Sequence, residues 1–176
     1  FLVDQPGAIQ ATILAGQLAP PSTDARSVEF DVANSVLGGE FSSRLNMNLR
    51  EEKSWAYGAY SFSPAAKGQR PWIAFAPVQI DRTADALKEM QREIAAYADG
   101  GEPATADEVA KIQATEIRSL PGSFETANAV LGQIGGIVRF GRPDNWVEVR
   151  RGRIEALNPA AVNEAATTLD PDALTW

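Results

Sequence analysis

The sequence contains no cysteine and no histidine among its 176 residues. Without cysteine, the chain cannot form a disulfide, a thiolate nucleophile or a cysteine-ligated metal site. Without histidine, it lacks the commonest zinc ligand and the commonest general base. These two absences exclude a Ser-His-Asp triad, an H-x-x-E-H zinc site and a Cys-His pair within this chain.

Basic residues are also scarce, with 16 Lys and Arg against 23 Asp and Glu and a formal net charge of −7. An acidic chain without a basic block is a poor partner for nucleic acid or for an anionic membrane surface. No apolar run approaches the roughly 20 residues that a transmembrane helix needs. We therefore expect neither a nucleic-acid partner nor a membrane partner.

Acidic residues alone could hold a metal ion, but only where several of them cluster. The candidates are the adjacent pairs Glu51-Glu52 and Asp107-Glu108. Neighbouring residues on a helix point about 100° apart, so such pairs do not chelate one ion together. We therefore expect no metal site within this chain.

The remaining composition is that of an ordinary globular protein, with 44% hydrophobic and 22% charged residues. This length predicts a single domain over residues 1–176 that can bury a substantial core. Because the sequence starts at Phe1 without a methionine, we expect it to be a fragment of a longer chain.

Alternating apolar residues predict three strands. The first covers 7–16, with Ile9 on the same face as Ile13, and the other two cover 55–62 and 72–79. A turn rich in small and polar residues joins the last two, which predicts an antiparallel hairpin. The final residues, from Pro171 onward, are typical of a further strand at its start.

Helical spacing of apolar residues accounts for the rest of the chain. It predicts helices over residues 25–37, 40–52, 81–97, 105–120, 127–138, 144–157 and, after an Asn158 cap, a short last helix. We expect Gly38-Gly39 to end the first of these in a left-handed conformation, and Phe41 to share the apolar stripe of the second with Leu45 and Leu49. This element order predicts an α+β fold, with a largely antiparallel sheet and helices packed mainly on one face.

Two neighbouring motifs carry more information than the composition does. They are LGGEFSSRL at 37–45 and LREEKSWAY at 49–57. Together they resemble the pitrilysin and insulysin type of zinc metallopeptidase, whose relatives include the mitochondrial processing peptidase. In that family a helix ends at Gly-Gly, a Phe-x-x-Arg-Leu helix follows, and a Leu-Arg-Glu turn leads into a strand that carries a tyrosine.

The resemblance implies a division of labour between two homologous halves. One half holds zinc through an inverted H-x-x-E-H motif, and the other supplies an arginine and a tyrosine across the cavity. Because this chain lacks histidine, it resembles only the second, C-terminal half, and Arg50 and Tyr57 match its substrate-binding and transition-state-stabilising pair. The implied cofactor is therefore zinc on a sister domain, and the implied partners are a homologous zinc-binding domain or subunit and a peptide substrate.

Each of these two residues also has a simpler interpretation. Considered without the motif, Arg50 is typical of a solvated cation at a helix C-terminus. Tyr57 is typical of a half-buried side chain that packs in a strand. The whole domain has an alternative too, as a catalytically inactive scaffold or interaction module of the same fold. The presence of both Arg50 and Tyr57 favours the peptidase half, because a scaffold does not need that pair.

Three further expectations accompany the resemblance. The isolated chain should have no peptidase activity and no stoichiometric zinc. Family halves pack on a sister domain, and open strand edges recruit partners, so we expect self-association of the isolated domain. The compartment does not follow from the residues, and the resemblance favours a periplasmic or otherwise exported protein over a cytoplasmic one.

Overall fold

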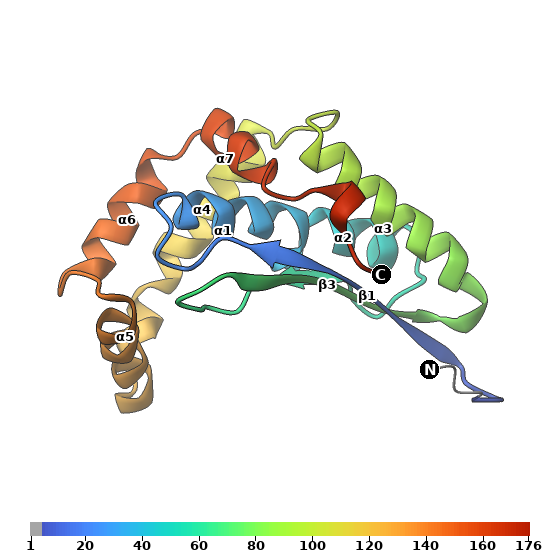
Figure 1. Ribbon diagram of the computed structural model, residues 1–176, viewed down its shortest axis with the longest axis horizontal. Helices are drawn as coiled ribbons and strands as arrows, with labels where there is room; N and C mark the ends of the chain where they lie inside the picture. The colour runs from blue at the N-terminus through green and yellow to red at the C-terminus, as the bar shows by residue number, and fades with distance from the viewer. Residues whose placement is uncertain (1–4) are drawn as a thin grey trace.

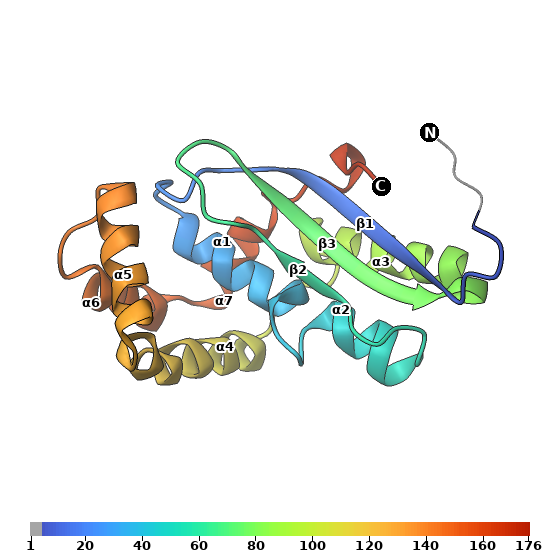
Figure 2. The same cartoon turned by 90° about the horizontal axis from the view of Figure 1, so that it is seen from below.

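The structure is a computed structural model that describes residues 5–176. Its three-stranded antiparallel sheet is covered on one face by a layer of helices (Figure 1). Seen from below, the strands lie in front of the helices and their outer face is open (Figure 2). The predicted α+β fold, with an antiparallel sheet and helices mainly on one face, is thus confirmed.

The sheet has the strand order β1-β3-β2. Its strands are β1 (Gln10–Ala19), β2 (Tyr60–Phe62) and β3 (Arg70–Gln79). The long central strand β3 pairs with β1 along its whole length, and Tyr60 lies opposite Phe75 in the predicted hairpin of β2 and β3.

All three strand predictions differ from the structure at their ends, since β1 extends to Ala19 and β3 begins at Arg70. The first strand begins at Gln10 and not at residue 7, so Ile9 precedes it and is 81% exposed, whereas Ile13 is buried. Of the predicted strand 55–62, only Tyr60–Phe62 forms β2, and Ala56 makes an isolated bridge to β3. Tertiary pairing with β3 therefore selects a shorter strand than the alternating pattern indicates.

Seven α-helices lie among the remaining described residues. They are α1 (Ser27–Asn34), α2 (Arg44–Asn46), α3 (Thr83–Ala98), α4 (Ala106–Ser119), α5 (Ala127–Phe140), α6 (Trp146–Ala156) and α7 (Pro159–Ala166). Wide π-helical turns extend the first two, over Ser35–Gly39 and Met47–Glu52. Thr105 and Glu108 form a capping box at the start of α4.

The glycine pair that follows α1 does not have the predicted left-handed conformation, which within residues 5–176 occurs at Gly7, Gly100 and Gly141 among the glycines. Gly38 instead allows a close approach to β2. A Cβ at this position would lie 2.5 Å from the backbone nitrogen of Ser61. The glycine is therefore required because the helix end touches the sheet.

The core lies between the sheet and the helices. Its largest fully buried side chains include Trp72, Tyr97, Leu45, Leu49 and Ile94. The polar atoms of the two aromatic residues are satisfied there, since the Trp72 indole donates to the Asn34 side chain at 2.7 Å and the Tyr97 hydroxyl donates to the Ala33 carbonyl at 3.2 Å.

The last residues return to the sheet. Thr175 exchanges both of its backbone hydrogen bonds with Gly16 of β1, at 2.9 and 3.0 Å. This bridge agrees with the strand start expected after Pro171. Within residues 5–176, no helix has the length and apolar character needed to cross a membrane.

Candidate functional site

Arg50 and Tyr57 lie together at the junction between the helical turn Met47–Glu52 and β2. The guanidinium carbon of Arg50 is 5.6 Å from the centre of the Tyr57 ring and 4.5 Å from the centre of the Phe41 ring. Two aromatic rings therefore contact one cation. Such contacts contribute about 0.5–1 kcal/mol each at exposed sites, enough to bias the position of a flexible side chain.

The group faces solvent. Tyr57 is 82% exposed and Phe41 is 57% exposed, while the Arg50 side chain is half-buried. Nε of Arg50 lies 3.4 Å from a carboxylate oxygen of Glu51, and among residues 5–176 this is its one ion pair. A guanidinium has five N–H donors, so most of the hydrogen-bonding capacity of Arg50 is available to a ligand.

The backbone between the two residues holds them in this arrangement. Ser54 has a φ of 55°, the one positive value outside glycine among the described residues. This left-handed turn directs the backbone N–H groups of Trp55 and Ala56 to the Leu49 carbonyl, at 2.9 and 3.2 Å. The Trp55 carbonyl then accepts a hydrogen bond from the Gln79 backbone at 2.9 Å, which attaches the segment to β3.

A buried asparagine links the two loops that carry the aromatic rings. Asn46 is fully buried, and its side-chain amide donates to the Phe41 carbonyl. Its side-chain oxygen accepts a hydrogen bond from the Ala59 backbone N–H at 3.1 Å. Asn46 thus connects the chain just before α2 with the chain just after Tyr57.

Phe41 and Asn46 also belong to this site, although no sequence motif predicts them there. Phe41 was expected on the apolar stripe of a helix from residue 40, but α2 begins only at Arg44, so Phe41 lies in the preceding loop and its ring reaches Arg50. No sequence signal marks Asn46, because its burial depends on tertiary packing.

The chemistry that this group can perform is limited to binding and donation. A guanidinium can bind carbonyl or carboxylate oxygens through its planar fork, and a phenol can donate one hydrogen bond to a developing oxyanion. Within residues 5–176, no three His, Cys, Asp or Glu side chains are placed to hold a metal ion.

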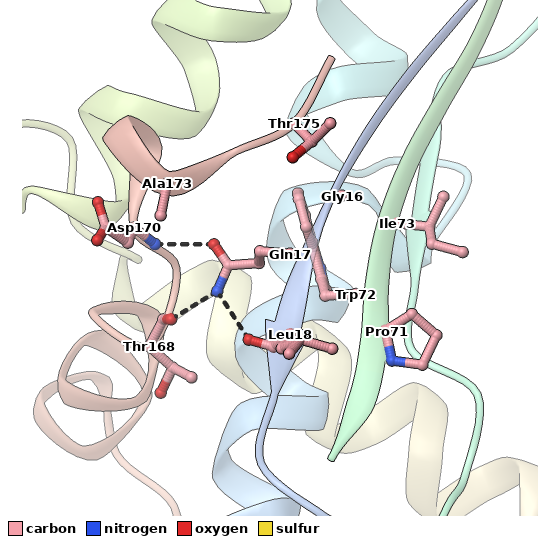
Figure 3. A pocket seen from close by; sticks show the side chains of 10 residues that line it. All are labelled: Gly16, Gln17, Leu18, Pro71, Trp72, Ile73, Thr168, Asp170, Ala173 and Thr175. Atoms are coloured by element: carbon pink, nitrogen blue, oxygen red, sulfur yellow. Dashed lines mark hydrogen bonds between the residues drawn. The ribbon is translucent and has the colours of Figure 1, made fainter.

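A hollow of about 700 Å³ lies away from Arg50 and Tyr57, between β1 and the C-terminal segment. There the Gln17 side chain donates to the Thr168 carbonyl and accepts from the Asp170 backbone N–H, both at 2.9 Å (Figure 3). Apart from the Asp170 carboxylate, its walls are apolar side chains, hydroxyls, an amide and backbone. Neither Arg50 nor Tyr57 lines it, so we assign this hollow to the packing of the C-terminal segment on β1.

Comparison with known protein families gives a match to the family described as "Peptidase M16 inactive domain", over residues 2–116. Among curated proteins, an uncharacterized zinc protease of Streptomyces coelicolor is 29% identical over 157 residues. That alignment includes 89% of this chain but only 34% of the zinc protease. The chain thus spans about a third of the length of this relative.

Solved structures share the fold. The peptidase M16 inactive domain from Pseudomonas fluorescens superposes with a TM-score of 0.84 at 24% identity, over 95% of this chain and 40% of that chain. A protease from Helicobacter pylori gives a TM-score of 0.84 at 19% identity, over 98% of this chain and 41% of that chain. At these identities the likeness concerns the fold alone.

Proposed function

Because the chain belongs to the peptidase M16 family, by its match to the inactive domain, we propose that it is the non-zinc half of a zinc-dependent endopeptidase. In this proposal Arg50 and Tyr57 bind the substrate and stabilise the transition state at a zinc ion on a homologous sister domain. The observation that carries the proposal is the contact of the Arg50 guanidinium with the exposed Tyr57 ring at 5.6 Å. Both donors face solvent together, where a substrate on another domain can reach them.

Zinc on the sister domain would polarise the scissile carbonyl and lower the pKa of its bound water. The residues of this chain perform the complementary tasks. Tyr57 donates its phenolic hydrogen to the carbonyl oxygen as negative charge develops there, and this stabilises the transition state more than the ground state. Arg50 binds a substrate carbonyl or carboxylate, and its contacts with Phe41 and Tyr57 limit the rotamer entropy lost on binding.

The test is steady-state kinetics of Tyr57→Phe in the enzyme assembled with its zinc domain. This change keeps the ring and removes only the donor, so we expect kcat to fall roughly 10²–10³-fold with little change in KM. Tyr60→Phe is the matched control, because Tyr60 lies in neighbouring β2 and is outside the Arg50 contact. It should leave both constants near their wild-type values.

Near-wild-type kcat/KM for Tyr57→Phe, in a protein that folds and assembles, would show that Tyr57 does not stabilise the transition state. A second measurement examines the division between the halves. Metal analysis of the chain alone should find no stoichiometric zinc, and a peptide assay should find no hydrolysis. One tightly bound zinc per chain would contradict the assignment of the metal to the sister domain.

We also propose that the isolated domain self-associates and that the protein is exported. Self-association is supported by apolar side chains on the open face of the sheet, where Leu14, Leu18 and Phe62 are 52%, 64% and 47% exposed. Light scattering at high concentration should show a dimer or larger species, and a monodisperse monomer would contradict this.

The proposed export of the protein rests on the family resemblance, and cell fractionation tests it.

A further inference from the structure

Arg142 lies in the turn between α5 and α6, at the end of the molecule that these helices form with α4 (Figure 1). Gly141, with a φ of 62°, ends α5 and turns the chain. The guanidinium carbon of Arg142 is 4.8 Å from the centre of the Phe140 ring and 4.4 Å from that of Trp146. Two aromatic rings thus hold this cation in one place.

The charges around Arg142 are not balanced. Three neighbouring arginines each have an acidic partner: Arg70 pairs with Asp31 at 2.9 Å, Arg150 with Glu116 at 2.8 Å and Arg153 with Glu29 at 2.7 Å. Arg142 forms no ion pair among residues 5–176, and its guanidinium makes one hydrogen bond, to the Ser22 carbonyl at 3.3 Å. Of these four arginines, Arg142 is thus the one without a direct ion pair among residues 5–176.

A cavity of about 200 Å³ opens beside this cation, between α4, α5 and α6. Arg142 and Arg150 line it together with Gln133 and Ser123. Neither the Gln133 amide nor the Ser123 hydroxyl forms a hydrogen bond with another of the described residues, so both can donate into the cavity. The Glu116 carboxylate also lines it but is held by Arg150 at 2.8 Å.

We propose that this cavity is a binding site for a small oxyanion, a phosphate or a carboxylate group, held by Arg142 with Gln133 and Ser123. A guanidinium fixed between two rings presents its planar fork with little further loss of entropy, and charge-assisted hydrogen bonds are the strong ones. The volume lies below the 300–1,000 Å³ or so of pockets for drug-sized ligands, so a single oxyanion with its waters fits.

The electrostatic environment agrees with this assignment. Burial lowers the pKa of Arg142, and the guanidinium groups of Arg150, Arg70 and Arg153 lower it further, although Asp31 opposes them. The protonated form of Arg142 is thus less favoured than that of an isolated arginine. A bound anion supplies the missing countercharge and removes this cost.

The experiment titrates the chain with inorganic phosphate, and separately with acetate, at constant ionic strength set by sodium chloride. We follow binding by isothermal calorimetry and by the NMR signals of the Gln133 side-chain amide. We expect saturable binding of at least one of the two anions, with a shift of the Gln133 signals. Phosphate binding without acetate identifies a phosphate site, and acetate binding identifies a carboxylate site such as a peptide could fill.

Variants connect the binding to Arg142. Arg142→Gln should weaken the affinity at least tenfold. Arg139→Gln is the matched control, because it removes the same charge from the same helix end. Arg139 is exposed, contacts the same Phe140 ring and lies outside the cavity. The affinity of this variant for the anion should therefore stay unchanged. If Arg142→Gln does not fold, Gln133→Leu replaces it and should also weaken binding. The proposal would be overturned if neither phosphate nor acetate showed saturable binding. It would also be overturned if the Arg139 and Arg142 variants lost affinity equally.

Discussion

Arg50 and Tyr57 contact each other at 5.6 Å although one lies in a helical turn and the other precedes a strand. Backbone hydrogen bonds around the left-handed Ser54, together with the attachment of Trp55 to β3, create this contact. The two donors consequently occupy one exposed surface on a rigid support. Preorganisation of this kind is what a substrate-binding pair requires.

Replacement of Arg50 should separate binding from catalysis. Arg50→Ala removes a charge-assisted hydrogen bond worth about 1.5–3 kcal/mol, so KM should rise roughly 10- to 100-fold in the assembled enzyme. Arg50→Lys should recover only part of this loss, because a lysine has no planar fork and does not stack equally well on Phe41 and Tyr57. Steady-state kinetics with both variants decides the point, and full recovery by lysine would show that charge alone is needed.

Asn46 should matter for stability as well as for the site. Asn46→Ala leaves the buried Ala59 N–H and the Phe41 carbonyl without this partner, so we expect a loss of about 1–3 kcal/mol in the free energy of unfolding. Urea denaturation measures it. Asn128→Ala, at an exposed position in α5, is the control and should change stability by less than about 0.5 kcal/mol. Equal stabilities for the two variants would remove Asn46 from its linking role.

Replacing Gly38 and Gly132 by alanine should change the stability of the protein in opposite directions. Gly38→Ala places a Cβ 2.5 Å from the Ser61 backbone nitrogen, so the helix end must move away from β2 at a cost of about 1–3 kcal/mol. Gly132→Ala meets open space in the middle of α5 and should stabilise the protein by about 0.5–1 kcal/mol. Thermal unfolding of both variants compares them directly. A stable Gly38→Ala protein would contradict the close approach.

Glu108 should make the stability depend on pH. Burial raises the pKa of this carboxyl, but hydrogen bonds from Arg44 and Thr105 outweigh burial and lower the pKa to about 2, from an ordinary value of 4.5. Because the folded-state pKa is depressed, the stabilisation is present above pH 4.5 and is lost as the pH falls through the folded value.

Glu108→Gln measures this contribution. We expect the variant to be less stable than the wild type at pH 7, and the difference in free energy of unfolding to shrink steadily between pH 4.5 and pH 2. Urea denaturation across this range provides the values. A difference that stays constant over the range would show that the Glu108 carboxylate does not gain its stabilisation from ionisation.

Much of the fold could be predicted because local signals agree with the tertiary structure. Helical spacing of apolar residues predicted helices over residues 81–97 and 105–120, where α3 and α4 lie. Strand ends were less predictable. Ile9 fits the alternating pattern, but β1 begins only where β3 offers a partner, and such pairing is non-local.

By itself the sequence determined the α+β class, the helices with strong periodicity and the motifs that mark Arg50 and Tyr57, because these depend on residues close together in the chain. Only the tertiary structure decided that Phe41 lies outside the helix and contacts the Arg50 guanidinium, and that Gly38 is needed for contact with Ser61. It also decided that Arg142 lies between two aromatic rings and forms no ion pair among residues 5–176. Each of these depends on which distant segments meet. No local pattern encodes such a meeting, because it follows from how helices and strands pack over one another in three dimensions.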